Sequence, residues 1–180
     1  ARRRAAWSHV SSTFIEYDIR ALSRLRDVQG IADIVICTET IEHILNDQKL
    51  MIDLAGCLKP GGRLLMTAPY EYYKAITPED DGPFSIVEDG GHVRRGYTAA
   101  SYRKLCERAG LNIEDFGFCS GLTSQWLTKI LRKLTVIDYR VGWLAILPLR
   151  ILPPVLDRII SLTGLWPDYS ITLIATKPKI

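Results

Sequence analysis

The distribution of apolar and polar residues along the chain predicts a regular succession of strands and helices. Residues 34–37 form an unbroken apolar run of isoleucine, valine and cysteine, which favours a strand buried on both faces. In residues 50–58 apolar side chains recur at steps of three and four, which indicates a helix. Proline and glycine in residues 59–62 end that helix, and residues 63–68 form a second apolar strand. Strand, helix, tight turn and strand together predict a βαβ unit with parallel strands.

The same patterns predict a further helix and two further strands. Residues 99–109 carry an apolar stripe, with Thr98 placed to cap the helix and Gly110 placed to end it. Residues 111–119 and residues 169–177 each have the composition of a strand. The chain is therefore expected to build one sheet with helices packed against it.

Residues 121–168 depart from this succession, because they are far longer than a common connection between strands. Residues 126–134 predict an amphipathic helix with basic side chains on one side. Residues 141–160 are strongly apolar but are interrupted by Arg150 and prolines, so no uninterrupted run reaches the roughly 20 residues that a spanning helix needs. Such a segment suits peripheral contact with a membrane, or a hydrophobic lid over a lipid-like acceptor. A helical subdomain that packs on the sheet or at a homodimer interface is the alternative.

Three motifs carry a resemblance to a known family. They are D-I-V-I-C from Asp33, E-H-I from Glu42 and L-K-P-G-G-R-L-L from Leu58. In this order and spacing they resemble the fourth strand, the following loop and the turn into the fifth strand of class I S-adenosylmethionine-dependent methyltransferases. The segment H-V-R-R-G-Y-T from His92, followed by a helix and a strand, is similar to a later pattern of the same family.

The resemblance implies a Rossmann-like α/β fold with a mostly parallel sheet and an antiparallel last strand. We expect a partial methyltransferase core in residues 1–120, a helical apolar insertion in residues 121–168 and the last strand of the core in residues 169–180. In the family the first strand, its glycine-rich loop and the second strand come before the position of Asp18, and this sequence shows no counterpart to them. We therefore expect the chain to be the carboxyl-terminal portion of a longer enzyme.

Four residues are candidates for cofactor contact by this resemblance. Residues 13–17 alternate as a strand that ends at Asp18, and family members often place an acidic residue there against the adenine amino group of S-adenosylmethionine. Asp18 and Ile19 occupy that place, whereas Thr38 and Glu39 follow the fourth strand beside the transferred methyl group. Capping of the next helix by Asp18 is an alternative that is compatible with the adenine contact.

Glu42 and His43 are the candidate catalytic residues. The unperturbed pKa of histidine, about 6.5, suits a general base that removes the proton of an acceptor, and Glu42 would orient the ring. The alternative is a histidine that caps or packs at the start of a helix. The pattern of Glu39, Glu42 and His43 is also similar to an E-x-x-E-H motif of family members that methylate hydroxyls with help from a divalent metal. His92 would be a fourth ligand, but our assignment contains no metal.

Aromatic residues after the fifth strand are candidates for acceptor binding. Tyr70, Tyr73 and His92 flank a polar, turn-rich segment at residues 77–91, and in the resembling family this region covers the acceptor site. The alternative is that the aromatic rings pack this loop onto the domain.

Composition limits the remaining choices. The net charge of +3, with 23 basic and 20 acidic residues, gives no indication of nucleic-acid binding. Four dispersed cysteines predict buried free thiols and hence a cytoplasmic protein, and the first residues lack the apolar segment of a secretory signal.

The function implied is methyl transfer from S-adenosylmethionine to a small-molecule, lipid or glycan-like acceptor. A non-catalytic or incomplete binding module is the first alternative. A Rossmann oxidoreductase is the second, and the antiparallel last strand argues against it.

Overall fold

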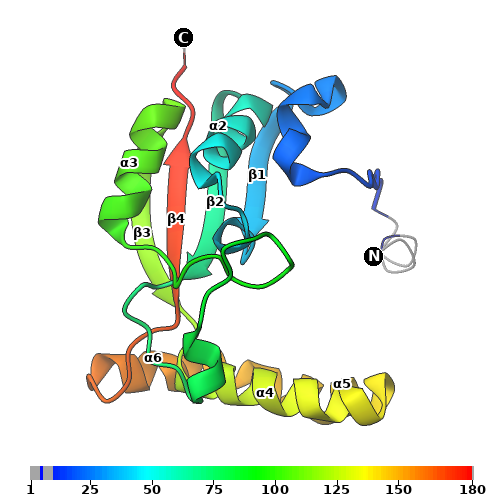
Figure 1. Ribbon diagram of the computed structural model, residues 1–180, viewed down its shortest axis with the longest axis vertical. Coiled ribbons are helices and arrows are strands. Elements are labelled where there is room, and N and C mark those ends of the chain that lie inside the picture. The colour runs from blue at the N-terminus through cyan, green and yellow to red at the C-terminus, as the bar shows by residue number, and fades with distance from the viewer. Residues whose placement is uncertain (1–4, 6–9, 180) are drawn as a thin grey trace.

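The computed structural model describes Ala5 and residues 10–179. Its centre is a four-stranded sheet in the order β1-β2-β4-β3 (Figure 1). β1 pairs in parallel with β2, whereas β4 runs antiparallel to both β2 and β3, so β4 alone is reversed among these four strands. The strands are β1 (Ala32–Thr38), β2 (Leu58–Pro69), β3 (Asn112–Cys119) and β4 (Ser170–Thr176). The predicted α/β sheet with an antiparallel last strand is confirmed.

α2 (Asp47–Cys57) connects β1 to β2. Its start is set by Asn46, whose side chain accepts a hydrogen bond of 3.0 Å from the backbone amide of Lys49. Residues 59–62, where a tight turn was expected, already belong to β2, which begins directly after α2. Glycine is needed at position 62 of this strand, because a Cβ there would lie 2.9 Å from the carbonyl oxygen of Ala32. The strand, helix and strand of the predicted βαβ unit are therefore present.

α3 (Ala99–Ala109) has the bounds that the sequence predicts. Thr98 and Ser101 form a capping box at its start, with each side chain bonded to the backbone of the other. Gly110 ends the helix in the left-handed conformation, with φ of 68°. These local signals lie within a few residues of the helix ends, which explains why the sequence alone locates them.

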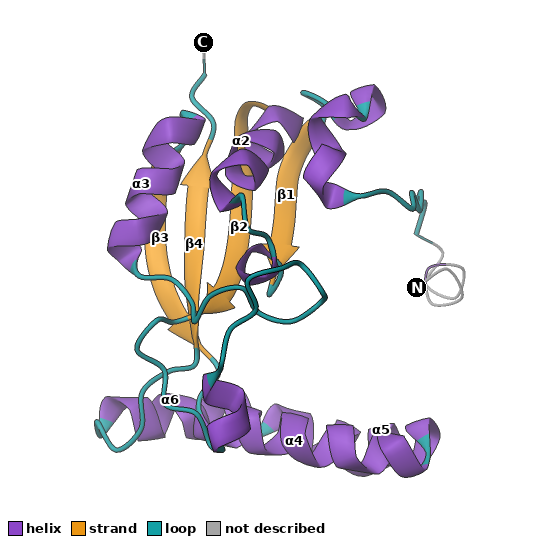
Figure 2. Cartoon of the chain, in the orientation of Figure 1, coloured by secondary structure: helices purple, strands orange, loops and turns teal. Residues whose placement is uncertain are grey.

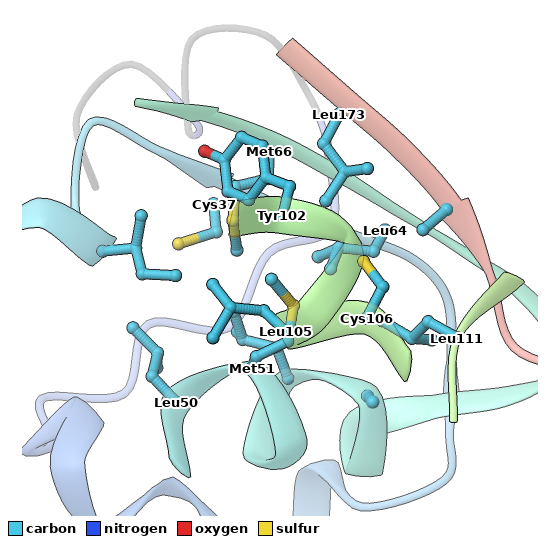
Figure 3. Close-up of a cluster of buried hydrophobic side chains, with 14 of the residues drawn as sticks. Cys37, Leu50, Met51, Leu64, Met66, Tyr102, Leu105, Cys106, Leu111 and Leu173 are labelled. Atoms are coloured by element: carbon cyan, nitrogen blue, oxygen red, sulfur yellow. The ribbon is translucent and has the colours of Figure 1, made fainter. Parts of the chain in front are cut away.

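α2 and α3 lie side by side over one face of the sheet and enclose the core with it (Figure 2). Tyr102 of α3 is fully buried and stacks on Tyr97, with ring centroids 5.0 Å apart. Figure 3 shows the apolar side chains of the two helices facing those of the strands. The residues labelled there are Cys37, Leu50, Met51, Leu64, Met66, Tyr102, Leu105, Cys106, Leu111 and Leu173.

The opposite face of β1 differs from the prediction. Burial on both faces was expected, but Ile34 and Ile36 are 56% and 67% exposed. The expectation is wrong because α2 and α3 both cover the other face, where alternate residues of β2 such as Leu64 are fully buried. A run of isoleucine and valine predicts a strand but does not reveal how many of its faces are covered.

Residues 13–17 are not a strand, in contrast to the prediction. They belong to no ladder, and Phe14, Ile15 and Tyr17 are exposed. An extended segment becomes a strand only when a neighbour supplies hydrogen bonds, and β1 lies at the sheet edge with β2 as its partner. The helix expected next consists of two short 3-10 segments, η1 (Ile19–Arg24) and η2 (Arg26–Val28).

Helices form a separate layer beyond the end of the sheet where β1 and β2 terminate (Figure 1). They are α4 (Leu122–Ile137), α5 (Tyr139–Ile146), η5 (Leu147–Ile151) and α6 (Pro153–Leu162). Two further 3-10 segments, η3 (Ile41–His43) and η4 (Pro78–Asp81), precede this layer in the chain. Among the described residues, no helix combines the length and the hydropathy that crossing a membrane requires.

The four cysteines are free, and three of them are buried as expected. Cys119 is exposed, so the expectation of burial is wrong for this thiol. Its position at the last residue of β3, where the strand leaves the sheet, explains the exposure.

The one-sided covering of the sheet predicts unequal costs for truncating similar side chains. We expect Leu64→Ala to lower the free energy of unfolding by about 2 to 5 kcal/mol, because it leaves a cavity in the core. Ile36→Ala removes a similar volume from the exposed face and should cost about 1 kcal/mol or less. Urea denaturation followed by circular dichroism measures both, and equal losses would contradict the one-sided core.

Candidate functional site

The candidate site lies where β1 and β2 end. Glu39 follows β1 directly and has a left-handed backbone with φ of 46°, which is uncommon for a residue with a side chain. Its amide donates a 2.9 Å hydrogen bond to the carbonyl oxygen of Thr67 in β2. This turn leads into η3, which carries Glu42 and His43. Ligands of parallel sheets bind at this edge, so the position agrees with a functional site.

Glu42 is a buried carboxyl group without a hydrogen-bond partner. Its side chain is 1% exposed, and neither carboxylate oxygen has a partner among the described residues. Burial raises its pKa to about 7, and the nearby charge of Glu39 acts in the same direction. Buried polar atoms are rarely left without a hydrogen-bond partner. The two oxygens therefore indicate that Glu42 binds a ligand, a proton or a cation.

The ring of His43 is held by the loop at residues 85–92. Its Nδ1 lies 2.9 Å from the carbonyl oxygen of Gly91, and since a carbonyl oxygen only accepts, Nδ1 carries the proton. In the neutral ring Nε2 is then the basic nitrogen. Nε2 lies 3.6 Å from Oε1 of Glu42, so the basic nitrogen and the buried carboxyl group face each other.

His92 completes the cluster from a distant part of the sequence. Its Nε2 lies 4.0 Å from Oε1 of Glu42, and its ring meets that of His43 edge-on with centroids 4.7 Å apart. Burial lowers the pKa of His92, and the charges of His43 and Arg132 lower it further. The ring is therefore biased toward its neutral form, which can act as a base or as a metal ligand.

Arg94 holds the two histidine segments together. Its guanidinium donates hydrogen bonds of 2.7 and 2.9 Å to the carbonyl oxygens of Ile44 and Leu45, and it pairs with Asp47 at the start of α2. In addition, the amide of Val93 donates to the carbonyl oxygen of Glu42 at 2.9 Å. These contacts place His92 beside His43 although the two residues are 49 positions apart in the sequence.

A cavity of about 850 Å³ opens at this edge. It is lined by four of the predicted residues, Glu39, Glu42, His43 and His92. Sequence analysis missed several other lining residues, namely Thr67, Ile76, Thr128, Lys129, Arg132, Tyr169 and Ser170. The place of Tyr169 and Ser170 at the start of the last strand could have indicated that they line the site. An antiparallel last strand begins at the edge where β1 and β2 end. For α4 the sequence predicted a helix with basic side chains on one side but did not place that side at this edge.

Glu39 is tied to this cavity by the last strand. Its Oε1 accepts a 3.0 Å hydrogen bond from the hydroxyl of Ser170. Burial raises the pKa of Glu39, although the hydroxyls of Thr67 and Ser170 counteract part of the increase. The site thus brings two carboxyl groups and two imidazoles together at one edge of the sheet.

The structure separates the remaining cofactor candidates from this cavity. Asp18 caps η1 and its carboxylate pairs with Arg20, which lowers the pKa of Asp18 to about 2. Ile19 packs against the core, and the carbonyl oxygen of Thr38 accepts a bond from the hydroxyl of Thr40. None of the three lines the 850 Å³ cavity.

Asp18 nevertheless has the chemistry that an adenine amino group requires. The carboxylate is held anionic by Arg20, and its side chain is 49% exposed, so it can accept another hydrogen bond. The capping role that the sequence offered as an alternative is also present, and the two roles are compatible.

The two tyrosines predicted to bind an acceptor are engaged in packing. The hydroxyl of Tyr73 donates a 2.5 Å hydrogen bond to the carbonyl oxygen of Asp80, and the ring is 2% exposed. The ring of Tyr70 meets that of Phe118 edge-on with centroids 5.0 Å apart. Neither lines the cavity, so this arrangement favours the packing role that the sequence left open.

Fold and site together define a Rossmann-like α/β domain with a polar cavity at the carboxyl ends of its parallel strands. A family model described as a methyltransferase domain matches residues 5–115. The chain belongs to this family. It is therefore assigned to the class I S-adenosylmethionine-dependent methyltransferases, with S-adenosylmethionine as the cofactor.

Solved structures share the fold at low sequence identity. A methyltransferase described as putative, from Bacillus halodurans C-125, is 15% identical with a TM-score of 0.57, and the match covers 99% of this chain and 77% of that one. An S-adenosylmethionine-dependent methyltransferase from Mesorhizobium loti is 15% identical with a TM-score of 0.55, covering 98% and 75%. The cyclase SpnF is 16% identical with a TM-score of 0.54, and this chain covers 61% of its length. A comparison with curated proteins found no match.

The cluster of Glu42, His43 and His92 also has the composition of a metal site. One ligand atom from each of the three lies within 4.8 Å of the others. The hydrogen bond from Nδ1 of His43 to Gly91 is the outer contact that typically orients a ligating histidine. The unpartnered oxygens of Glu42 fit a divalent cation, and the mixed oxygen and nitrogen donors suit a borderline transition metal.

The raised pKa of Glu42 predicts a pH-dependent gain in stability on substitution. The carboxyl group keeps its proton to about pH 7 when folded, but its ordinary pKa is 4.5. The folded chain therefore binds more protons between these values, and Glu42 lowers stability as pH rises through this window. With a chelator present, we expect Glu42→Gln to raise Tm by about 5 °C near pH 8 and to change it little near pH 5.

Thermal melts followed by circular dichroism at both pH values measure this difference. Glu107→Gln, which changes an exposed glutamate of α3, is the matched control and should leave Tm nearly unchanged at both. Equal effects of Glu42→Gln at the two pH values would show that the carboxyl group is ionised throughout.

Proposed function

We propose that this chain transfers the methyl group of S-adenosylmethionine to a hydroxyl or amino group of a small, lipid-like acceptor. The observation that carries the proposal is the cluster of Glu42, His43 and His92 in a cavity at the strand ends of a methyltransferase domain. The shared fold would not suffice, because one of the similar structures is a cyclase.

The cluster can perform the proton transfer that methylation of a hydroxyl requires. S-adenosylmethionine supplies a methyl group on a positively charged sulfur, which leaves as a neutral thioether when the acceptor atom attacks in line. His43 presents the basic Nε2 to the cavity, since Nδ1 is occupied by Gly91, and it takes the proton of the acceptor. Above about pH 7, where Glu42 is ionised, its carboxylate, 3.6 Å away, stabilises the resulting imidazolium.

The lining of the cavity favours an amphiphilic acceptor. The catalytic cluster lines the cavity together with the basic side chains of Lys129, Arg132 and Lys133 from α4. Ile76 and the stems of these side chains add apolar surface. An acceptor with an apolar body and an anionic group fits this lining better than an uncharged sugar.

Binding of the demethylated cofactor tests the cofactor site. We expect S-adenosylhomocysteine to bind in a calorimetric titration, and Asp18→Ala to weaken it at least about tenfold by removing one charge-assisted hydrogen bond. Asp27→Ala removes an exposed aspartate of η2 and should leave the affinity unchanged. A folded chain that binds neither S-adenosylmethionine nor this product would favour the non-catalytic binding module.

Proton transfer and metal assistance can be separated in one assay of methyl transfer. With labelled S-adenosylmethionine and a panel of hydroxyl and amino acceptors, His43→Ala should lower the rate by about 10²- to 10⁴-fold. It should leave the affinity for S-adenosylhomocysteine unchanged, because the proposed role of His43 is to act on the acceptor.

Chelation then decides whether a metal belongs to the mechanism. If Glu42, His43 and His92 hold a divalent ion, a chelator will abolish transfer and added Mn²⁺ will restore it. Calorimetry should detect Mn²⁺ binding that Glu42→Gln removes. Full activity in the chelator would rule out the metal and leave His43 as the base, whereas a rate unchanged by His43→Ala would contradict that role.

A further inference from the structure

Exposed apolar side chains are concentrated on the helical layer α4, α5, η5 and α6. Val136 and Ile137 at the end of α4 are 87% and 81% exposed, Leu144 of α5 is 73% exposed and Ile151 of η5 is 75% exposed. α6 continues the surface with Leu162, which is 73% exposed. A monomeric protein rarely exposes so many large apolar side chains on contiguous elements, so this surface is expected to meet a partner.

The folding of the layer explains why these side chains stay exposed. α5 packs closely against α4, where a Cβ added at Gly142 would lie 2.8 Å from the side chain of Thr135. The main contact of the layer with the sheet is that of α6 with β3, and the joined α4 and α5 project beyond the sheet (Figure 1). Each of these helices therefore buries apolar side chains against its neighbours on one side only, and its other side stays exposed.

The charges of the layer identify the chemistry of the partner. Residues 122–165 carry six basic side chains and two acidic ones. Both acidic groups are occupied as helix caps, since Asp157 accepts from Thr123 and Ser124 and Asp138 accepts from backbone amides at the start of α5. Asp157 is buried and Asp138 is exposed, but the excess of basic side chains leaves the layer with a positive net charge. A partner therefore needs a negatively charged polar surface next to an apolar interior.

We propose that the helical layer docks on an anionic lipid bilayer and lies in its interface. Its apolar side chains would enter the acyl boundary, while basic residues such as Arg140 would meet lipid phosphates. Trp126 and Tyr139 are 50% and 59% exposed, and their amphipathic rings suit the headgroup region. A second copy of the chain fits less well, because two positively charged layers would face each other.

The position of the layer links this proposal to the proposed function without depending on it. α4 contributes Lys129 and Arg132 to the wall of the catalytic cavity. Docking of α4 on a bilayer would thus bring the cavity close to acceptors dissolved in the lipid. Binding to vesicles requires neither cofactor nor catalysis, so its failure and the failure of methyl transfer are distinguishable.

Co-sedimentation with vesicles tests the docking surface. We expect the chain to bind vesicles of phosphatidylcholine containing phosphatidylglycerol, to bind vesicles of phosphatidylcholine alone much more weakly, and to dissociate at high salt. The double variant Leu144→Glu and Ile151→Glu should weaken partitioning at least about tenfold by placing acidic groups in the apolar surface. Arg140→Gln should weaken it about fivefold.

Ile86→Glu is the matched control, because Ile86 is 88% exposed but lies in the loop at residues 82–98. It should partition like the unmodified chain, and circular dichroism should show that all variants are folded. The proposal is overturned if anionic vesicles do not bind the chain, or if the double variant partitions as well as the control. It is also overturned if light scattering shows a dimer that the double variant dissociates while vesicle binding is unchanged.

Discussion

Parallel pairing of β1 with β2 is the constraint on which the site depends. Two parallel strands end at the same edge of the sheet, and the antiparallel β4 begins there. The residues that follow or open these strands therefore converge, which brings Glu39 into contact with Ser170 although 131 residues separate them. One-sided packing of α2 and α3 fixes the sheet and leaves this edge open to the cavity.

The polar groups at this edge are held in an arrangement that is unfavourable without a ligand. Glu42 is buried with both oxygens unpartnered, and Glu39 has a left-handed backbone. Each feature costs stability on its own, and strain of this kind collects at functional sites. The surrounding contacts maintain it, chiefly the hydrogen bonds of Arg94 to the segment after His43 and the bond from Ser170 to Glu39. A site that is built before its ligand arrives loses less free energy in ordering when the ligand binds.

The helical layer contributes both to the wall of the cavity and to the exposed apolar surface. One side of α4 forms a wall of the cavity through Thr128 and Lys129, while other positions on the same helix, such as Val136, are exposed and apolar. Within the layer, buried Asp157 of α6 anchors the start of α4.

Local signals in the sequence determined much of this protein. The apolar periods predicted α2, α3 and the four strands of the sheet, and Thr98 and Gly110 set the bounds of α3, because caps and turns depend on neighbouring residues. The order of motifs indicated the methyltransferase family and selected Glu39, Glu42, His43 and His92, which the cavity brings together. Tertiary structure alone decided that residues 13–17 pair with no strand and that one face of β1 is exposed. It also decided that α4 lines the cavity and that Tyr73 uses its hydroxyl for packing. These outcomes depend on which distant segments become neighbours. A period of apolar residues along the chain indicates that one face of an element is buried, but it does not identify the segment that covers that face.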